Sequence, residues 1–272
     1  SDRSVALPPL NKFLAKDLIE STRASKMLDQ FHNMPPVDRN ALKKVLLSVS
    51  EMVCELPWIV ELDLTLIVDE DGAIAADARI VIDHISGAGG DRYAHMAIYP
   101  YPVHLIQQWQ MNDGRDVTIR PIRPEDADME QDFVRGMSDE SRYYRFMDTL
   151  RELSQTMLVR FTQIDYHREL ALVAVIDTPQ GEQQIGVVRY TTLPDEETCE
   201  FAIVVGDDWQ GKGLARRMFT RLIEAARDRR LKVMTGVTLR ENTRMIDLSR
   251  SQGFETRTDA EDPELVQMTL VL

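Results

Sequence analysis

Apolar and polar positions follow a helical spacing and then a strand spacing over about the first 80 residues. Apolar residues recur every three or four positions from Leu10 to about Leu28, and again after Asp38, which can cap a helix that begins there. After Pro57 the apolar and polar residues alternate, and the run from Asp69 to Gly72 has the composition of a turn. This pattern predicts a helix, helix, hairpin module, with helices over 10–28 and 38–56 and strands over 60–66 and 73–82.

The order of elements changes in the second half of the chain. Short apolar runs, separated by turn residues such as those at 178–181, occur together with amphipathic helical patterns. The predicted strands cover 117–120, 169–177, 184–192, 198–205, 233–239 and 265–271, and the predicted helices cover 125–137, 154–163, 213–229 and 243–251. We therefore expect an α/β fold in which helices flank a mixed sheet.

A segment between these two regions fits neither pattern. Residues 86–91 have the glycine-rich composition of a flexible linker, and residues 99–102 alternate Tyr and Pro, which disfavours a helix or a central strand. The sequence therefore predicts a first domain over 1–84, a linker over 85–114 and a second domain over 115–272.

The composition supports two ordered domains. At 272 residues the chain is long for one core, and 43% hydrophobic with 28% charged residues is typical of a globular protein. The net charge of -13 argues against non-specific nucleic-acid binding, which needs a basic surface, so we expect proteins or small molecules as partners. Cys54 and Cys199 lie far apart in apolar runs, which predicts two buried, reduced thiols and no disulfide framework.

The sequence has no run of about 18 apolar residues and no signal peptide, so we expect no membrane association and a cytoplasmic location. The histidines share no metal-ligand spacing, which predicts that no metal is bound. The chain opens without Met and leads quickly into patterned sequence, which suggests a piece of a longer polypeptide. No pattern specifies an oligomeric state.

The segment 199–217 is the most informative part of the chain, because a strand runs into a glycine-rich turn that opens an amphipathic helix. Several unpaired backbone N–H groups converge in such a turn, and the helix dipole adds positive charge, so a pyrophosphate can bind there without many cationic side chains. Gly211 and Gly213 would let the ligand approach the backbone closely. Taken alone, the glycines favour an ordinary strand-to-helix connection over a ligand site.

This segment resembles the acetyl-CoA signature of the Gcn5-related N-acetyltransferase (GNAT) superfamily, which is Gln or Arg, two residues, Gly, one residue, then Gly or Ala. A later motif of that family is matched as well. The matching residues are Gln210, Gly213 and Ala215, then Asn242, Leu248, Gly253 and Phe254. The resemblance covers about 116–272 and implies a GNAT mixed sheet flanked by helices, with acetyl-CoA as the co-substrate and no metal.

The resemblance also implies where acetyl-CoA binds. Backbone groups of one strand would pair with the pantetheine arm in a splay between neighbouring strands, and the turn would hold the pyrophosphate. The expected cofactor-binding residues are Ile203, Val204, Val205, Gln210, Gly211, Lys212, Gly213, Leu214, Ala215, Arg216 and Asn242. In this family the region around Arg142 and Arg145 lines the acceptor side, although a solvated helix face explains that cluster equally well.

Acetyl transfer requires a neutral amine, so a carboxylate must accept a proton from a lysine ammonium. Glu200 is the candidate base, because it precedes the expected pantetheine-binding stretch, where partial burial would raise its pKa. Glu196 and Glu197 in the preceding loop are competitors, and a surface strand glutamate is the simpler interpretation without the motif. Many family members have a Tyr seven residues after the motif Asn that assists the departing thiolate, whereas this chain has Ser249.

The first module resembles the C-terminal lobe of the ATP-grasp domain in NDP-forming acyl-CoA synthetases, on the residues at 7–11, 61–63 and 76–79. The metal-binding motif of that family is not matched at Leu64, Thr65 and Leu66. The chain therefore lacks one expected magnesium ligand, and we do not expect nucleotide chemistry. The second domain follows a small α+β ATP-grasp remnant, an order similar to that of bacterial Pat-type protein lysine acetyltransferases.

The resemblance therefore predicts an enzyme that acetylates lysine side chains of metabolic enzymes such as acyl-CoA synthetases, by direct attack of the amine with a glutamate base. Two alternatives stay open. One is an acetyltransferase for a small amine, and the other is a non-catalytic module that senses acetyl-CoA. A carboxylate at Glu200 favours an enzyme over a sensor, since a protein that only binds acetyl-CoA does not need it.

Overall fold

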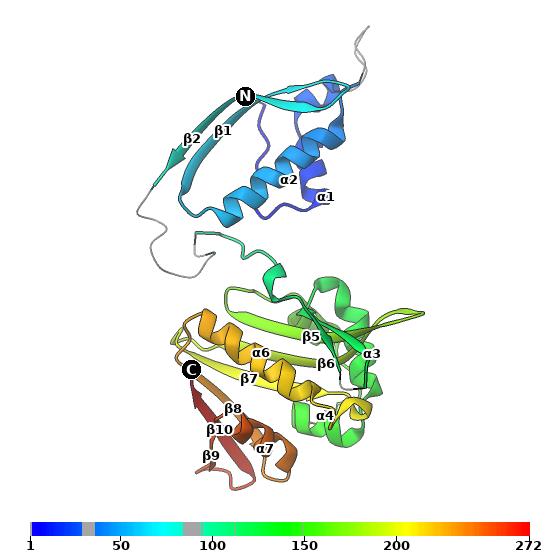
Figure 1. Ribbon diagram of the computed structural model, residues 1–272, viewed down its shortest axis with the longest axis vertical. Helices are drawn as coiled ribbons and strands as arrows, with labels where there is room; N and C mark the ends of the chain where they lie inside the picture. The colour runs from blue at the N-terminus through cyan, green and yellow to red at the C-terminus, as the bar shows by residue number, and fades with distance from the viewer. Residues whose placement is uncertain (1, 29–35, 84–92, 94, 112, 149) are drawn as a thin grey trace. The chain divides into compact units, whose positions relative to one another are not determined.

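The computed structural model describes residues 2–28, 36–83, 93, 95–111, 113–148 and 150–272. The chain divides into two units, Ser1–Pro100 and Tyr101–Leu272 (Figure 1). This division falls within the segment that the sequence analysis assigned to a linker, although the glycine-rich run at 86–91 lies outside the described residues. The second unit includes the last part of the predicted linker, from Tyr101 onward.

The first unit contains two helices and a short 3-10 helix. Helix α1 (Lys12–Glu20) begins after Asn11, whose side chain accepts the Leu14 N–H, and α2 (Arg39–Glu55) begins after Asp38, which accepts two N–H groups. The single helix predicted over 10–28 is wrong, because α1 ends at Glu20 and a 3-10 helix, Arg23–Met27, follows. The hydroxyls of Ser21 and Thr22 donate to carbonyls of α1, which competes with continuation of the helix.

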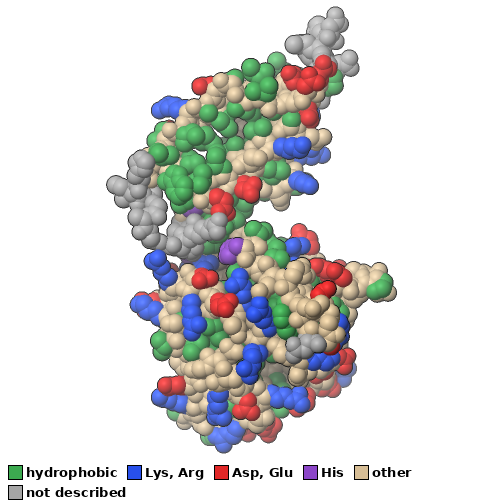
Figure 2. Space-filling view, in the orientation of Figure 1, with side chains coloured by type: hydrophobic (Ala, Val, Ile, Leu, Met, Phe, Trp, Pro, Cys, Tyr) green, Lys and Arg blue, Asp and Glu red, His purple; other side chains and the backbone are tan. Residues whose placement is uncertain are grey.

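An antiparallel hairpin completes this unit, with strands β1 (Ile59–Val68) and β2 (Ala73–Ile82). The Asp69 side chain accepts the N–H groups of Asp71 and Gly72, each at 3.0 Å, which closes the turn. Helix α2 packs against the hairpin. Many large apolar side chains remain exposed in this unit, including Ile74 at 67%, and Figure 2 shows them gathered in green patches on its surface. The helices of this unit therefore cover only part of its apolar surface.

An eight-stranded sheet forms the centre of the second unit, in the order β3-β4-β5-β6-β7-β8-β10-β9. The pair β7–β8 is parallel, and the other neighbouring pairs are antiparallel. The strands are β3 (Gln107–Gln110), β4 (Asp116–Pro121), β5 (Glu169–Thr178), β6 (Gly181–Thr192), β7 (Thr198–Val205), β8 (Val233–Leu239), β9 (Glu255–Thr258) and β10 (Leu265–Val271). The predicted α/β fold with a mixed sheet is confirmed.

Helices cover both faces of this sheet. The helices are α3 (Ala127–Gly136), α4 (Asp139–Phe146), α5 (Gln155–Thr162), α6 (Leu214–Asp228) and α7 (Thr243–Ser251). Helix α6 runs across one face of β5–β7 (Figure 1), where Phe201, Phe219 and Phe254 pack together. A second core joins α3 and α5 to the opposite face, and Phe146 of α4 packs against it. We call these the α6 face and the α3–α5 face.

Two edge strands, β3 and β9, each four residues long, are not predicted by the residue pattern. Strand β3 lies in the predicted linker and is rich in glutamine, so it has little apolar alternation of its own. Its hydrogen-bonding partner β4 supplies the pairing that orders it, from Gln107 opposite Ile119 to Gln110 opposite Asp116. Short edge strands of this kind are defined by their neighbours rather than by their own composition.

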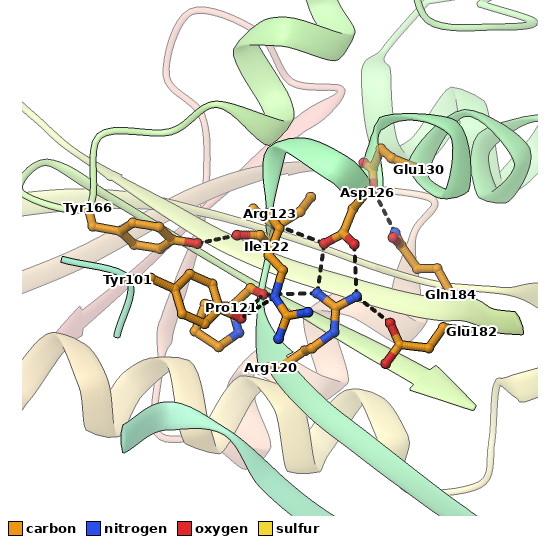
Figure 3. Close-up of polar contacts among 10 residues, drawn as sticks. All are labelled: Tyr101, Arg120, Pro121, Ile122, Arg123, Asp126, Glu130, Tyr166, Glu182 and Gln184. Atoms are coloured by element: carbon orange, nitrogen blue, oxygen red, sulfur yellow. Dashed lines mark hydrogen bonds and ion pairs between the residues drawn. The ribbon is translucent and has the colours of Figure 1, made fainter. Parts of the chain in front are cut away.

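A buried ion-pair network connects β4 to the loop before α3 (Figure 3). The Arg120 guanidinium donates to both carboxylate oxygens of Asp126, at 2.7 and 2.8 Å, and to Glu182 at 2.7 Å. Burial alone would lower the pKa of Arg120, but its hydrogen bonds to these two carboxylates raise it. Asp126 also accepts the Arg123 N–H at 2.7 Å. The network fixes the start of α3 against the β5–β6 hairpin.

No helix among the described residues is long and apolar enough to cross a lipid bilayer.

Candidate functional site

The parallel strands β7 and β8 are paired for only three residues. Their register runs from Thr198 opposite Val233 to Glu200 opposite Thr235. Beyond that point β7 stays paired with β6 as far as Val205, and β8 stays paired with β10 as far as Leu239. The two strands therefore diverge after Glu200 and Thr235, and we call this divergence the splay.

One edge of β7 is open along the splay. The carbonyls of Glu197 and Cys199 accept hydrogen bonds from the β8 side, whereas the Thr198 carbonyl and the Gly206 N–H bond toward β6. Because backbone groups alternate in direction along a strand, the groups of Phe201, Ile203 and Val205 face the splay. An extended ligand can therefore hydrogen-bond there as an added strand.

The predicted pantetheine-binding residues divide between the two edges of β7. Ile203 and Val205 lie on the open edge, while the backbone of Val204 faces β6. The Val205 carbonyl already accepts the Gln210 amide at 3.2 Å. Phe201 shares the open edge, and the sequence analysis did not include it. The period-two alternation of the strand would identify Phe201 once the side occupied by β8 is known.

The loop after β7 presents a cluster of backbone N–H groups. Gly211 and Gly213 have φ values of 72° and 85°, in the left-handed region that glycine adopts without strain. Within the described part of the chain, no acceptor is bonded to the N–H groups of residues 211–216, and the first turn of α6 has no acidic side chain. A Cβ atom at either glycine would meet open space. The helix N-terminus is therefore free to bind an anion such as a pyrophosphate.

The polar side chains of this loop hold its own structure. Gln210 accepts a hydrogen bond from Arg244 at 2.7 Å and reaches the Ser141 hydroxyl at 3.4 Å. The Lys212 ammonium donates to the Asp208 carbonyl at 2.6 Å and lies over the Trp209 ring. Leu214 is fully buried under the helix start, and Arg216 is exposed beside it. The backbone of the loop, more than its side chains, is therefore available to a ligand.

Glu200 lies at the vertex of the splay, and its side chain is exposed. The partial burial that the sequence analysis expected for Glu200 is wrong, because no described element covers this position of β7. Alternation along β7 places Glu200 on the α3–α5 face, the face on which Val204 packs. The competitor Glu197 forms an ion pair with Lys232, and Glu196 lies in the preceding turn with φ 59°.

The later motif lies at the start of α7. Asn242 caps this helix by accepting the Met245 N–H at 3.2 Å, and its amide donates to the Thr238 hydroxyl at 3.1 Å. Ser249, at the position of the family tyrosine, is fully buried, and its Oγ atom has no hydrogen-bond partner among the described residues. Its hydroxyl is therefore enclosed within the protein and does not open onto the splay.

Cys54 and Cys199 are free and buried, as predicted. Burial raises the pKa of the Cys199 thiol, next to Glu200, to about 12. This thiol stays protonated at neutral pH and packs into the core of the α6 face, so it is a poor nucleophile for a covalent acetyl intermediate. Among the residues that the structure describes, no three His, Cys, Asp or Glu side chains are arranged to hold a metal ion.

Comparison with known proteins agrees with this geometry. Residues 1–82 match the ATP-grasp domain family, and residues 116–255 match the acetyltransferase (GNAT) domain family. Over 162 residues the chain is 34% identical to acetyltransferase PA5475 of Pseudomonas aeruginosa, a match that covers 60% of this chain and 87% of that protein. Over 82 residues it is 34% identical to the acetate–CoA ligase (ADP-forming) I subunit beta of Pyrococcus furiosus, covering 30% of this chain and 35% of that protein.

Among solved structures, the GNAT domain of S. lividans PAT superposes with a TM-score of 0.58 at 28% identity. That match covers 64% of this chain and all of the other domain, 100% of its length. The splay and the glycine-rich helix start both lie within residues 116–255, the range that matches the acetyltransferase family. The chain thus belongs to the GNAT acetyltransferase family and is an acetyl-CoA-dependent N-acetyltransferase.

Proposed function

We propose that this enzyme transfers the acetyl group of acetyl-CoA to lysine side chains of metabolic enzymes such as acyl-CoA synthetases. The 28% identity to the GNAT domain of S. lividans PAT supports a protein acceptor, in line with the resemblance to Pat-type enzymes. The ATP-grasp match of the first unit, which extends to a ligase subunit, supports a link to acyl-CoA synthetases. We further propose the domain boundaries given by the sequence, with the acetyltransferase domain beginning near residue 115.

In this proposal acetyl-CoA lies in the splay. The pyrophosphate accepts hydrogen bonds from the free N–H groups at 211–216, and the helix dipole of α6 adds to their attraction. The pantetheine arm pairs with the open backbone edge at Phe201 and Ile203. Because this arm extends along β7 toward the vertex, the thioester comes to lie near Glu200.

The observation that carries the proposed chemistry is the exposed Glu200 carboxylate at the vertex of the splay. Glu200 accepts a proton from the lysine ammonium, directly or through one water, and the neutral amine attacks the thioester carbonyl. As the C–N bond forms, the nitrogen releases its second proton to solvent, and the C–S bond breaks. The CoA thiolate leaves and is protonated by solvent or by the Glu200 carboxylic acid, which restores the base for the next cycle.

Transfer of radiolabel from acetyl-CoA to a panel of acyl-CoA synthetases tests the proposed acceptor. We expect label on lysine residues of at least one synthetase, and its loss when Glu200→Gln replaces the parent enzyme. The same assay with small amines provides the contrast. Label on small amines alone would reject the protein acceptor, and acetyl-CoA binding without transfer to any amine would favour a sensor.

A further inference from the structure

Arg189 of β6 is a buried arginine with no ion-pair partner among the described residues. It lies on the α3–α5 face and is 9% exposed. Its Nη2 atom donates to the Phe161 carbonyl at 3.2 Å, and its guanidinium lies 4.4 Å from the centroid of the Phe161 ring. The Nε atom is buried and has no hydrogen-bond partner among the described residues. Across the described ranges, the bond from Nη2 is thus the one hydrogen bond of this guanidinium.

Arg145 of α4 lies near the same Phe161 ring and within electrostatic reach of Arg189. Its guanidinium lies 5.0 Å from the ring centroid of Phe146 and 5.9 Å from that of Phe161, the ring that Arg189 also contacts. Over the described ranges of the chain, Arg145 makes no hydrogen bond and no ion pair. Burial, together with the like charge of Arg189, lowers the pKa of Arg145 to about 10, so Arg145 stays charged at neutral pH.

The nearby carboxylates do not neutralise this pair directly. Glu130 of α3 is buried and accepts the Gln184 amide at 2.5 Å, and Glu169 of β5 faces the same region. Both attract Arg189 at a distance, and Arg160 of α5 opposes them. In the described structure neither arginine has a carboxylate oxygen within the 4.0 Å of an ion pair. Two like charges, one buried and one partly buried, are unfavourable without a direct partner unless an anion binds between them.

The strand register places this pair beside the candidate base. Arg189 lies opposite Ala202, and Thr191 lies opposite Glu200, so Arg189 and Glu200 are diagonal neighbours on the α3–α5 face. Diagonal neighbours of adjacent antiparallel strands are about 7–8 Å apart, within reach of long side chains. Helix α4, which carries Arg145, packs against β7. An anion held by the two arginines would therefore lie several ångströms from an amine at Glu200.

We propose that Arg145 and Arg189 form a subsite that binds a carboxylate of the acceptor substrate, next to the amine that is acetylated. The carboxylate can come from an acidic residue that flanks the target lysine, or from the α-carboxylate of a free amino acid. Planar guanidinium groups bind carboxylates with paired hydrogen bonds, which the unused donors of Arg189 can supply. The inference rests on the proposed function in taking Glu200 as the position of the amine.

Matched acceptors test this subsite. One pair is a lysine peptide with a flanking Glu and the same peptide with Gln, and the other is free lysine and lysinamide. We expect the parent enzyme to favour the carboxylate member of at least one pair by about 10- to 100-fold in kcat/KM, the range for a hydrogen-bonded charged group. Preference within the peptide pair identifies a flanking acidic residue, and preference within the lysine pair identifies an α-carboxylate.

Arg189→Met and Arg145→Met should each lower kcat/KM for the carboxylate acceptor while leaving the neutral acceptor and the affinity for acetyl-CoA within about twofold. Arg160→Met, which removes an exposed arginine from α5, is the matched control and should keep the preference. Equal losses on both acceptors would show a structural role and overturn the proposal. If either variant fails to fold, the other variant and the preference of the parent enzyme still test the subsite.

The outcomes also separate this inference from the proposed function. Acetylation of both members of each pair at equal rates overturns the subsite and leaves lysine acetylation intact. Acetylation of no lysine acceptor, with transfer to other small amines, overturns the proposed function. In that case the same comparison between carboxylate-bearing and neutral small amines decides the subsite.

Discussion

Glu200 and Thr235 are the last pair of residues that joins β7 to β8. Before this pair the two strands make a continuous sheet, and after it they separate while each keeps its other neighbour. The candidate base therefore lies where the open backbone edge of β7 begins. A single structural feature, the end of one strand pairing, brings the proposed base and the proposed cofactor site together.

Glu200→Gln keeps the size and polarity of the side chain but cannot accept a proton. We expect turnover at neutral pH to fall by roughly 10²–10⁴, with the affinity for acetyl-CoA changed by no more than a few fold. Part of the lost rate should return as the pH rises, because more of the lysine amine is then already neutral. Steady-state rates across pH, with titration calorimetry for binding, measure both effects. Glu197→Gln is the control, and full activity of Glu200→Gln would move the base to another group.

Gly213→Ala places a methyl group where the pyrophosphate approaches the helix start. The positive φ of 85° makes alanine unfavourable by about 1–2 kcal/mol, so stability should fall as well. Gly114 has φ 86° and equally open surroundings in the β3–β4 turn, and Gly114→Ala is therefore a matched control for strain. We expect both variants to lose similar stability, and only Gly213→Ala to lose acetyl-CoA affinity, by about tenfold or more. Equal affinities by calorimetry would contradict the assigned anion site.

Gly236 of β8 leaves room for the ring of Phe201, since a Cβ atom there would lie 2.5 Å from that ring. Gly236→Ala should destabilise the protein by about 1–3 kcal/mol through overpacking. It should also weaken acetyl-CoA binding, because the backbone of Phe201 lies on the open edge of the splay. A second change, Phe201→Leu, should recover part of the stability in the Gly236→Ala background, as denaturant unfolding of the double mutant would show. Purely additive losses would argue against this contact.

The carboxylate of Asp207 links the loop after β7 to α4 through Ser138 and Ser141. Desolvation alone would raise the pKa of Asp207, but hydrogen bonds from these serines hold it below its ordinary value. Because this pKa is lower in the folded protein, the ionised carboxylate stabilises the fold at pH values above the unfolded pKa near 3.8. This stability is lost as the pH falls through the folded pKa. Asp207→Asn should therefore be less stable than the parent at pH 7, by about 1 kcal/mol for the weakened hydrogen bonds.

Thermal unfolding at several pH values checks this prediction. The difference between Asp207→Asn and the parent should shrink below about pH 4, where the parent loses the same charge. Asp208→Asn changes the neighbouring exposed carboxylate and should have little effect at any pH. A difference that stays constant from pH 3 to pH 7 would assign the effect to packing instead of charge.

Asp126 and Glu182 share the Arg120 guanidinium but differ in exposure, with side chains 9% and 41% exposed. Asp126→Asn leaves a buried arginine without its principal counter-charge and should cost about 3–5 kcal/mol in unfolding free energy. Glu182→Gln should cost about 1 kcal/mol or less, since its ion pair is partly solvated. Urea unfolding of the two variants gives the comparison. Equal losses would show that burial does not decide the strength of this network.

Local residue patterns predicted much of the secondary structure of the second unit. Strand β8 and helix α7 have the predicted bounds, and the glycine-rich turn lies between a strand and a helix, as predicted. These features depend on contacts within a few residues, such as the positive φ values of Gly211 and Gly213 and the cap by Asn242. Features that depend on such short-range contacts can be predicted from the sequence alone.

Only the tertiary structure decided how distant segments meet. The splay depends on β7 pairing with β8 after an intervening helix, and the exposure of Glu200 depends on which elements cover β7. The approach of Arg145 to Arg189 joins a helix to a strand more than 40 residues away in sequence. Strand register and burial are set by long-range packing, which no local alternation of apolar and polar residues specifies. The sequence therefore identified the cofactor loop, and the fold decided what surrounds the reacting groups.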